Sequence, residues 1–233
     1  MKNFTFFVDG NTQQKVEFEV IRILNGGFAG RNQEQVKKHI EELAHLGVPA
    51  PKATPVFYPL LADKLSTDRE LEVVGTGNSG EVEFVILYSE QGLLVGVGSD
   101  HTDRDLEKVS IIKSKQAYPN IISQDVWLYK DVINHWDGLE MRSWLGPNRE
   151  SLYQEGTLAE LMRPEDLMAK AEALIEGEIT GTALYSGTLA TLEEIKFSDF
   201  FHVELLDKVR GQKLSYAYRI RPLSWYKGDL ETL

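Results

Sequence analysis

Residues 81–105 read EVEFVILYSEQGLLVGVGSDHTDRD, and this stretch decides both the fold and the candidate site. It contains two apolar runs, EVEFVILY and LLVGVGS, on either side of Ser89-Glu90-Gln91-Gly92, which is the pattern of a β-hairpin. Neither face of the first run is polar throughout. A strand that is apolar on both faces is normally covered on both, so we expect this hairpin in the interior of the protein.

Three carboxylates are expected to meet on one face of this hairpin. Side chains alternate along a strand, so Glu81 and Glu83 point to the same side. A loop of two or four residues places Asp100 opposite Glu81, with the Cβ atoms about 4.5–5.5 Å apart. A three-residue loop would turn Asp100 to the other face, and a frayed strand would leave both glutamates in water.

Such a cluster needs a compensating charge. Two unit charges about 4 Å apart repel by about 1 kcal/mol in bulk water and by about 4 kcal/mol near a protein surface. A divalent cation is the simplest compensation, and three oxygen ligands favour Mg²⁺ or Mn²⁺, with Ca²⁺ as a further candidate, over zinc. Three carboxylates and one divalent ion still sum to −1, so a site for an anionic substrate needs more cations. The nearest in sequence are Arg104, Lys113 and Lys115.

The rest of the chain predicts a mainly β (β-rich α+β) fold with peripheral helices, in a single domain over residues 1–233. Apolar residues alternate around the turn Asp9-Gly10-Asn11, which indicates an N-terminal β-hairpin region within residues 1–30. Residues 32–59 hold a helix over 33–46 and then a connector with four prolines. Further elements are expected as follows: helices near 123–135 and 164–176, and strands near 182–189, 200–206 and 213–221.

Composition narrows the classes of function. The 233-residue chain is 42% hydrophobic with a formal net charge of −11, so it can bury a core, and nucleic acid would be repelled. No stretch approaches the roughly 18 apolar residues of a membrane span, and MKNFTFFVDG turns polar too early for a signal peptide. The absence of cysteine excludes a thiol nucleophile and thiolate zinc sites. We expect a cytoplasmic protein with no nucleic-acid or membrane partner.

The first helix offers an acid–base pair. At about 100° per residue, His39 and Glu42 lie at the edge of the apolar stripe formed by Val36, Ile40 and Leu43, and as i, i+3 neighbours they can touch. An ordinary half-buried surface pair fits the same pattern. In the functional interpretation, Glu42 orients His39 and raises its basicity, and His39 takes a proton from water.

Several motifs, in this order, resemble the fumarylacetoacetate hydrolase superfamily. Its members carry an E-x-E strand and then D-x-[ST]-x-R-D-[LV]-[QE], and here these are Glu81-Val82-Glu83 and Asp100-His101-Thr102-Asp103-Arg104-Asp105-Leu106-Glu107. Lys113-Ser114 resembles the family's K-[ST] element, and Lys115 aligns equally well. His39-Ile40-Glu41-Glu42 resembles the H-x-x-E lid helix. Gly187-Thr188 resembles the G-T-P element, whose proline is replaced by Leu189.

This resemblance implies a fumarylacetoacetate hydrolase-like mixed β-sandwich roll, usually dimeric, in which Mg²⁺ or Mn²⁺ chelates a small 2-oxo or 1,3-dicarbonyl acid. It implies Glu81, Glu83 and Asp100 as the metal ligands. The catalytic residues that it implies are His39, Glu42 and Lys113. The candidate substrate contacts are Arg31, Arg104, Lys115 and Thr188. An exposed arginine before a helix and an ordinary strand threonine fit Arg31 and Thr188 as well.

We therefore expect a metal-dependent hydrolase or lyase, which hydrolyses a carbon–carbon bond or decarboxylates its substrate through a metal-stabilised enolate. The alternative is a non-catalytic protein that keeps the fold and binds small acids or another protein. The expected partners are a small anionic oxo acid and, in a homodimer, a second copy of the chain. No G-x-G-x-x-G fingerprint, P-loop or G-x-S-x-G elbow supports a nucleotide cofactor or a serine triad.

Overall fold

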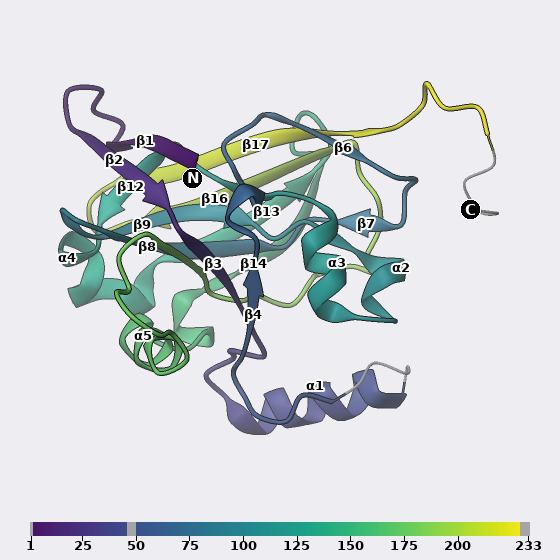
Figure 1. The fold of residues 1–233 in the computed structure, drawn as a ribbon, viewed down its shortest axis with the longest axis horizontal. Coiled ribbons are helices and arrows are strands. Elements are labelled where there is room, and N and C mark those ends of the chain that lie inside the picture. Colours follow the sequence, from purple (N-terminus) through teal and green to yellow (C-terminus); the bar gives the residue numbers. More distant parts are fainter. Residues whose placement is uncertain (1, 46–49, 229–233) are drawn as a thin grey trace.

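The computed structural model describes residues 2–45 and 50–228, which form two packed β-sheets with helices at their edges (Figure 1). This confirms the expected β-rich α+β fold with peripheral helices. In the described part of the chain, no helix is long and apolar enough to cross a membrane.

The larger sheet has ten strands and contains the hairpin of residues 82–99. Its main path runs β2-β1-β12-β9-β8-β15-β3-β4, and β11 and β5 extend it from β9. The pairs β1–β12, β3–β15 and β5–β11 are parallel, and the other pairs are antiparallel. The strand bounds are β1 Lys2–Val8, β2 Lys15–Val20, β3 Arg22–Gly27, β4 Val56–Leu60, β5 Leu65–Ser66, β8 Val82–Ser89, β9 Gly92–Ser99, β11 Asn120–Ile122, β12 Asp125–Leu128 and β15 Thr182–Tyr185.

The smaller sheet has five strands in the order β14-β13-β16-β17-β6, and a separate short pair joins β7 to β10. Only the β17–β6 pair of this sheet is parallel. The expected strands near 200–206 and 213–221 are confirmed as β16 and β17. The strand bounds are β6 Glu70–Val73, β7 Asn78–Ser79, β10 Thr102–Asp103, β13 Glu140–Leu145, β14 Ser151–Thr157, β16 Phe200–Asp207 and β17 Gln212–Pro222.

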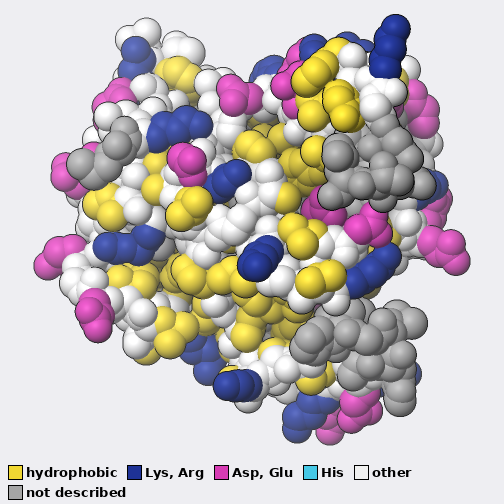
Figure 2. All heavy atoms as spheres, turned by 45° about the vertical axis from the view of Figure 1, so that its right-hand side comes forward, with side chains coloured by type: hydrophobic (Ala, Val, Ile, Leu, Met, Phe, Trp, Pro, Cys, Tyr) yellow, Lys and Arg dark blue, Asp and Glu magenta, His cyan; other side chains and the backbone are white. Residues whose placement is uncertain are grey.

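The helices are short and lie around the sheets, and α1 stands apart from both sheets (Figure 1). In Figure 2, hydrophobic side chains gather in the middle of the visible face, and charged side chains of both signs surround them. The helix bounds are α1 Gln33–His45, α2 Arg104–Glu107, α3 Ile111–Ala117, α4 Tyr129–Val132 and α5 Pro164–Glu172, with 3₁₀ helices η1 Ala62–Lys64, η2 Ile133–Gly138 and η3 Leu158–Glu160.

One expected element is wrong in part. The helix expected near 123–135 begins only at Tyr129, because residues 125–128 form strand β12 between β1 and β9. Val126 and Trp127 are both buried on this strand, where their large side chains fill the core on its two faces. β-Branched and aromatic residues favour such a buried strand, and here that packing overrides the helical spacing.

Two hydrophobic clusters cover the two faces of the β8–β9 hairpin. Phe84 and Val97 lie in the cluster between the two sheets, together with residues of β13, β16 and β17. Val85 and Leu87 lie in the second cluster, on the other face of the large sheet, with residues of β1, β2 and β3. The hairpin is therefore an interior element, as its sequence predicts, and the carboxylates at its open end lie at the margin of the second cluster.

Candidate metal centre

The β8–β9 hairpin brings Glu81, Glu83 and Asp100 together. Its loop has two residues, because Ser89 pairs with Gly92, and Glu83 pairs with Gly98 further along the ladder. The N–H of Glu81 donates to the carbonyl of Asp100 and the N–H of Asp100 to that of Glu81, at 3.1 Å each. One carboxylate oxygen from each of the three residues lies within 4.8 Å of the others. Among the residues with described side chains, this is the one group of three or more His, Asp or Glu residues with that geometry.

Gly98 makes room for this arrangement. A Cβ atom there would lie 2.5 Å from the carbonyl oxygen of Ile121, 2.9 Å from Val85 and 3.0 Å from the ring of Tyr185. Those separations are shorter than van der Waals contact, so only glycine fits opposite Glu83. The aromatic ring of Tyr185 can therefore lie against the strand at Gly98, and its hydroxyl donates to the carbonyl of Ile121 at 3.0 Å.

Two of the three carboxylates are almost fully buried. Glu83 is 1% exposed, and its Oε2 accepts a hydrogen bond of 2.9 Å from the N–H of Gly187. Burial, together with the negative charge of Asp100, raises the pKa of Glu83 well above its ordinary value. Burial also raises the pKa of Asp100, although the nearby Lys115 opposes that shift. In both groups the free energy of the ionised form is raised, so binding a proton or a cation is favourable.

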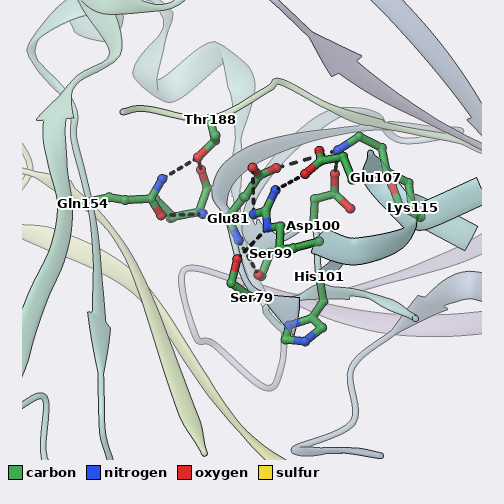
Figure 3. Close-up of polar contacts among 12 residues, drawn as sticks. Ser79, Glu81, Ser99, Asp100, His101, Glu107, Lys115, Gln154 and Thr188 are labelled. Atoms are coloured by element: carbon green, nitrogen blue, oxygen red, sulfur yellow. Dashed lines mark hydrogen bonds and ion pairs between the residues drawn. The ribbon is translucent and has the colours of Figure 1, made fainter. Parts of the chain in front are cut away.

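Lys115 and Arg104 supply the positive charge. The ammonium of Lys115 contacts Asp100 Oδ2 and lies 3.7 Å from Glu81 Oε2, and it lies 5.9 Å from the centre of the Tyr58 ring. Arg104 donates to Glu81 Oε1 at 3.0 Å. Burial opposes ionisation of Glu81, but the charges of Arg104 and Lys115 more than offset it and lower its pKa. Figure 3 shows Glu81, Asp100 and Lys115 grouped together.

Arg104 is held in place by further contacts. Its Nε donates to Ser79 Oγ at 2.8 Å, and its second terminal nitrogen donates to Glu107 Oε2 at 2.9 Å. The side chain of Asp103 accepts hydrogen bonds from the N–H groups of Asp105 and Leu106, and so caps the helix that carries Arg104. This explains the density of acids after Asp100, because one of them starts α2 and another pairs with the arginine.

Residues 26–218 match a family model described as "Protein of unknown function (DUF2848)". The chain belongs to the DUF2848 family. No curated protein matches it.

Solved structures show the wider fold of this DUF2848 chain. A proposed fumarylacetoacetate isomerase/hydrolase from Oleispira antarctica aligns with a TM-score of 0.68 and 15% identity, over 92% of this chain and 98% of that one. A proposed fumarylpyruvate hydrolase from Burkholderia cenocepacia aligns with a TM-score of 0.62 and 17% identity, over 95% and 96%. The apo form of 2-keto-3-deoxy-D-arabinonate dehydratase aligns with a TM-score of 0.62 and 13% identity, over 91% and 78%. The DUF2848 chain therefore has the fumarylacetoacetate hydrolase fold.

The carboxylate cluster of the DUF2848 protein fits a divalent cation. Arg104 and Glu107 offset each other, so the three carboxylates and Lys115 sum to −2, the charge that one divalent ion neutralises. Asp100 Oδ1 is buried and accepts no hydrogen bond from any described group. An acceptor oxygen that is left bare in the interior costs free energy, and a bound cation would satisfy it.

The Gly187–Thr188 turn closes one side of the centre. Gly187 has a positive φ of 83°, and its N–H points to Glu83. Thr188 Oγ1 donates to the carbonyl of Val82 at 2.7 Å and accepts from Gln154 Nε2 at 2.8 Å, so both functions of the hydroxyl are used within the protein. Gln154 was not expected at the site, since no local sequence pattern marks a single glutamine on a strand.

Arg31 lies elsewhere in the structure. Its guanidinium forms a bidentate pair with Asp137, at 2.8 and 2.9 Å, and donates to the carbonyls of Leu161 and Leu158 at 2.9 and 3.2 Å. These contacts join Arg31, two residues before α1, to η2 and η3. The expected contact between Arg31 and a substrate carboxylate stays a prediction, and it would require the arginine to leave Asp137.

The three residues expected to act in catalysis are Lys113, His39 and Glu42, and the structure describes the side chain of Lys113 only. Lys113 is exposed on α3, whereas Lys115 on the same helix is buried in the cluster. The backbones of His39 and Glu42 belong to α1, as expected, but their side chains lie outside the described part of the structure. Their roles as base and orienting acid stay predictions.

His101 is a buried residue that the sequence did not single out. Its Nδ1 lies 3.0 Å from the hydroxyl of Tyr218 and its Nε2 2.9 Å from Asn78 Oδ1. Burial lowers the pKa of His101 to about 3, so the imidazole is neutral. The residue links β9, β17 and β7 beneath Asp100, which is a structural role next to the candidate metal centre.

Proposed function

We propose that this protein is a metal-dependent enzyme for small 2-oxo or 1,3-dicarbonyl acids, acting as a carbon–carbon hydrolase or as a decarboxylase. The observation that carries the proposal is the buried group of three carboxylates with two counter-cations, on a fold shared with proteins whose names refer to such acids. The cation that we propose is Mg²⁺ or Mn²⁺, with Ca²⁺ as a further candidate.

Glu81, Glu83 and Asp100 would hold the cation. When bound, it would stabilise the negative charge that develops on an enolate oxygen as the bond to the neighbouring carbon breaks. Side chains of the protein would bind the substrate and move its protons. Lys115 and Arg104 are positioned to attract the carboxylate of an anionic substrate, because both lie next to the cluster and remain protonated.

Lys115 is the better candidate for the active lysine. Its ammonium is within reach of two of the proposed metal ligands, whereas Lys113 points to solvent. For a hydrolytic reaction we propose that His39, oriented by Glu42, takes a proton from water. Decarboxylation needs no activated water, so in that case the same two residues of α1 would orient the substrate instead.

Absorbance assays test this proposal. We expect oxaloacetate or an acylpyruvate to be consumed in the presence of Mg²⁺ or Mn²⁺, and not after EDTA treatment, and we expect Asp100→Asn to be inactive. Binding of oxalate without turnover of any 2-oxo or 1,3-dicarbonyl acid would instead support the non-catalytic alternative. The proposed homodimer is tested separately by light scattering of the purified protein.

A further inference from the structure

Three buried polar atoms next to the candidate metal centre have no hydrogen-bond partner among the described residues. They are Asp100 Oδ1, Asn120 Oδ1 and Asn25 Nδ2. All three side chains belong to residues that are 0% exposed. Buried amide and carboxylate groups are rarely left bare, because each lost hydrogen bond costs about 1–3 kcal/mol. The two bare acceptor oxygens, Asp100 Oδ1 and Asn120 Oδ1, therefore leave room for a cation or a hydrogen-bond donor between them.

Asn120 stands beside Asp100. Strand β11 pairs with β9 so that Ile121 lies opposite Ser99 and Ile122 opposite Gly98. One further step along this register places Asn120 opposite Asp100, and opposed residues of an antiparallel pair point to the same side. Asp100 is thus flanked by Glu81 on one neighbouring strand and by Asn120 on the other.

The strand β5 gives an independent check of this orientation. Asn120 pairs with Leu65 in a parallel ladder, and Leu65 belongs to the same hydrophobic cluster as Val85. Val85 lies two residues after Glu83, and so on the face of β8 that carries the carboxylates. Asn120 therefore faces the same side of the large sheet as the candidate metal ligands.

A neighbouring amide takes up one of the two polar atoms of the Asn120 side chain. Asn120 Nδ2 donates to Asn25 Oδ1 at 2.8 Å, across the interior between β11 and β3. This bond engages the nitrogen and leaves the carbonyl oxygen of Asn120 without a donor. On Asp100, Lys115 engages Oδ2 and leaves Oδ1. A single cation can satisfy two bare acceptor oxygens on adjacent strands, since amide oxygens serve as ligands of hard cations beside carboxylates.

We propose that Asn120 Oδ1 is a fourth protein oxygen for the divalent cation held by Glu81, Glu83 and Asp100. Asn25 is a positioning residue, which orients the Asn120 amide so that its oxygen faces the cluster. The inference rests on the proposed function, because it needs the three carboxylates to bind a cation.

The test is the affinity of the purified protein for Mn²⁺, measured by the electron paramagnetic resonance signal of the free ion. We expect Asn120→Leu, a change of similar size, to weaken Mn²⁺ binding at least about tenfold, as losses around metal sites do. Asn120→Asp keeps an oxygen and adds a charge, so it should bind Mn²⁺ at least as tightly as the wild type and melt at a lower temperature without metal.

Two further variants separate positioning from general stability. Asn25→Leu should weaken Mn²⁺ binding, and Asn25→Asp should restore it, because the carboxylate still accepts from Asn120 Nδ2. Ser123→Ala is the matched control. It removes a buried hydroxyl just after the same strand, which accepts from Val97 N–H and donates to the carbonyl of Asp125. We expect Ser123→Ala to lower the melting temperature and leave the Mn²⁺ affinity unchanged.

Each outcome decides between the inference and the proposed function. Wild-type binding with unchanged affinity in Asn120→Leu overturns the role of Asn120 and leaves the three-carboxylate site intact. If Asn120→Leu does not fold, weaker Mn²⁺ binding by Asn120→Asp than by the wild type overturns the inference instead. A wild type that binds no Mn²⁺ overturns the proposed function, and this inference with it.

Discussion

The ammonium of Lys115 contacts Asp100 Oδ2 in a pair that is almost closed to water, with 7% of the lysine side chain and 0% of the aspartate side chain exposed. Burial alone would discharge the lysine, but the carboxylates of Asp100, Glu81 and Glu83 more than offset it and raise the pKa of Lys115. The lysine is therefore a fixed positive charge within the cluster. It offsets part of the carboxylate repulsion when no cation is bound.

Of the two lysines of α3, only Lys115 should be needed for turnover and for stability. Lys115→Met should lower turnover by about 10²–10³, the usual cost of losing a charge aimed at the reacting group. It should also lower the metal-free stability by about 3–5 kcal/mol, because it leaves Asp100 without its buried partner. Lys113→Met, the exposed control, should match the wild type in steady-state kinetics and in denaturant unfolding. A loss of turnover in Lys113→Met alone would reverse the assignment.

The metal-free stability should depend on pH through Glu83. Burial and the charge of Asp100 raise the pKa of Glu83 above its ordinary value of 4.5, so the folded state holds a proton that the unfolded state releases. The stability that this proton provides is present below about pH 4.5 and is lost as the pH rises through the folded-state pKa.

Glu83→Gln keeps an acceptor for the Gly187 N–H and removes the charge. In EDTA at about pH 8 we expect this variant to be more stable by about 1 kcal/mol, which corresponds to about 2–4 °C in melting temperature for a chain of this size. Its melting temperature should also fall less than that of the wild type between about pH 5 and pH 8. Parallel curves for the two proteins would argue against a raised pKa at Glu83.

Arg31 and Asp137 should act as one unit that anchors the start of α1. We expect Arg31→Gln and Asp137→Asn to lower the melting temperature by similar small amounts, and the double variant to add little, because both single changes break the same pair. The KM for a substrate should then change equally in the two variants. A rise in KM confined to Arg31→Gln would show that the arginine binds the substrate itself.

The acid–base step rests on α1. If the reaction is hydrolytic, His39→Ala should reduce turnover by about 10²- to 10⁴-fold and leave the affinity for Mn²⁺ near that of the wild type. Glu42→Gln should have a milder effect, since it keeps an acceptor but loses the charge that favours the imidazolium. Unchanged hydrolysis of an acylpyruvate by His39→Ala would remove the histidine from the mechanism.

The sequence alone predicts the part of the site that depends on one hairpin. Alternation along the strand and the length of the loop place Glu81 opposite Asp100, and the structure confirms this pairing. These relations are local, because they depend only on residues joined by a short turn. The strands near the C-terminus are predictable for the same reason, since each carries its own alternating pattern.

Contacts between distant segments could not be predicted. Arg31 and Asp137 are 106 residues apart, and nothing near either residue in the sequence identifies its partner. Lys113 and Lys115 point about 200° apart on a helix, so the choice between them depends on which side of α3 faces the cluster. Only the folded chain shows that Lys115 faces it. The strand at 125–128 was missed because its partners, β1 and β9, decide its conformation.

The most direct test of the central claim is a crystal structure of the protein with Mn²⁺ and oxalate, with anomalous diffraction data collected for manganese. We predict one strong anomalous peak within about 2.0–2.6 Å of a carboxylate oxygen from each of Glu81, Glu83 and Asp100, with oxalate bound to the same ion. An empty cluster at saturating Mn²⁺, with Lys115 still paired to Asp100, would contradict a metal-dependent function at this site.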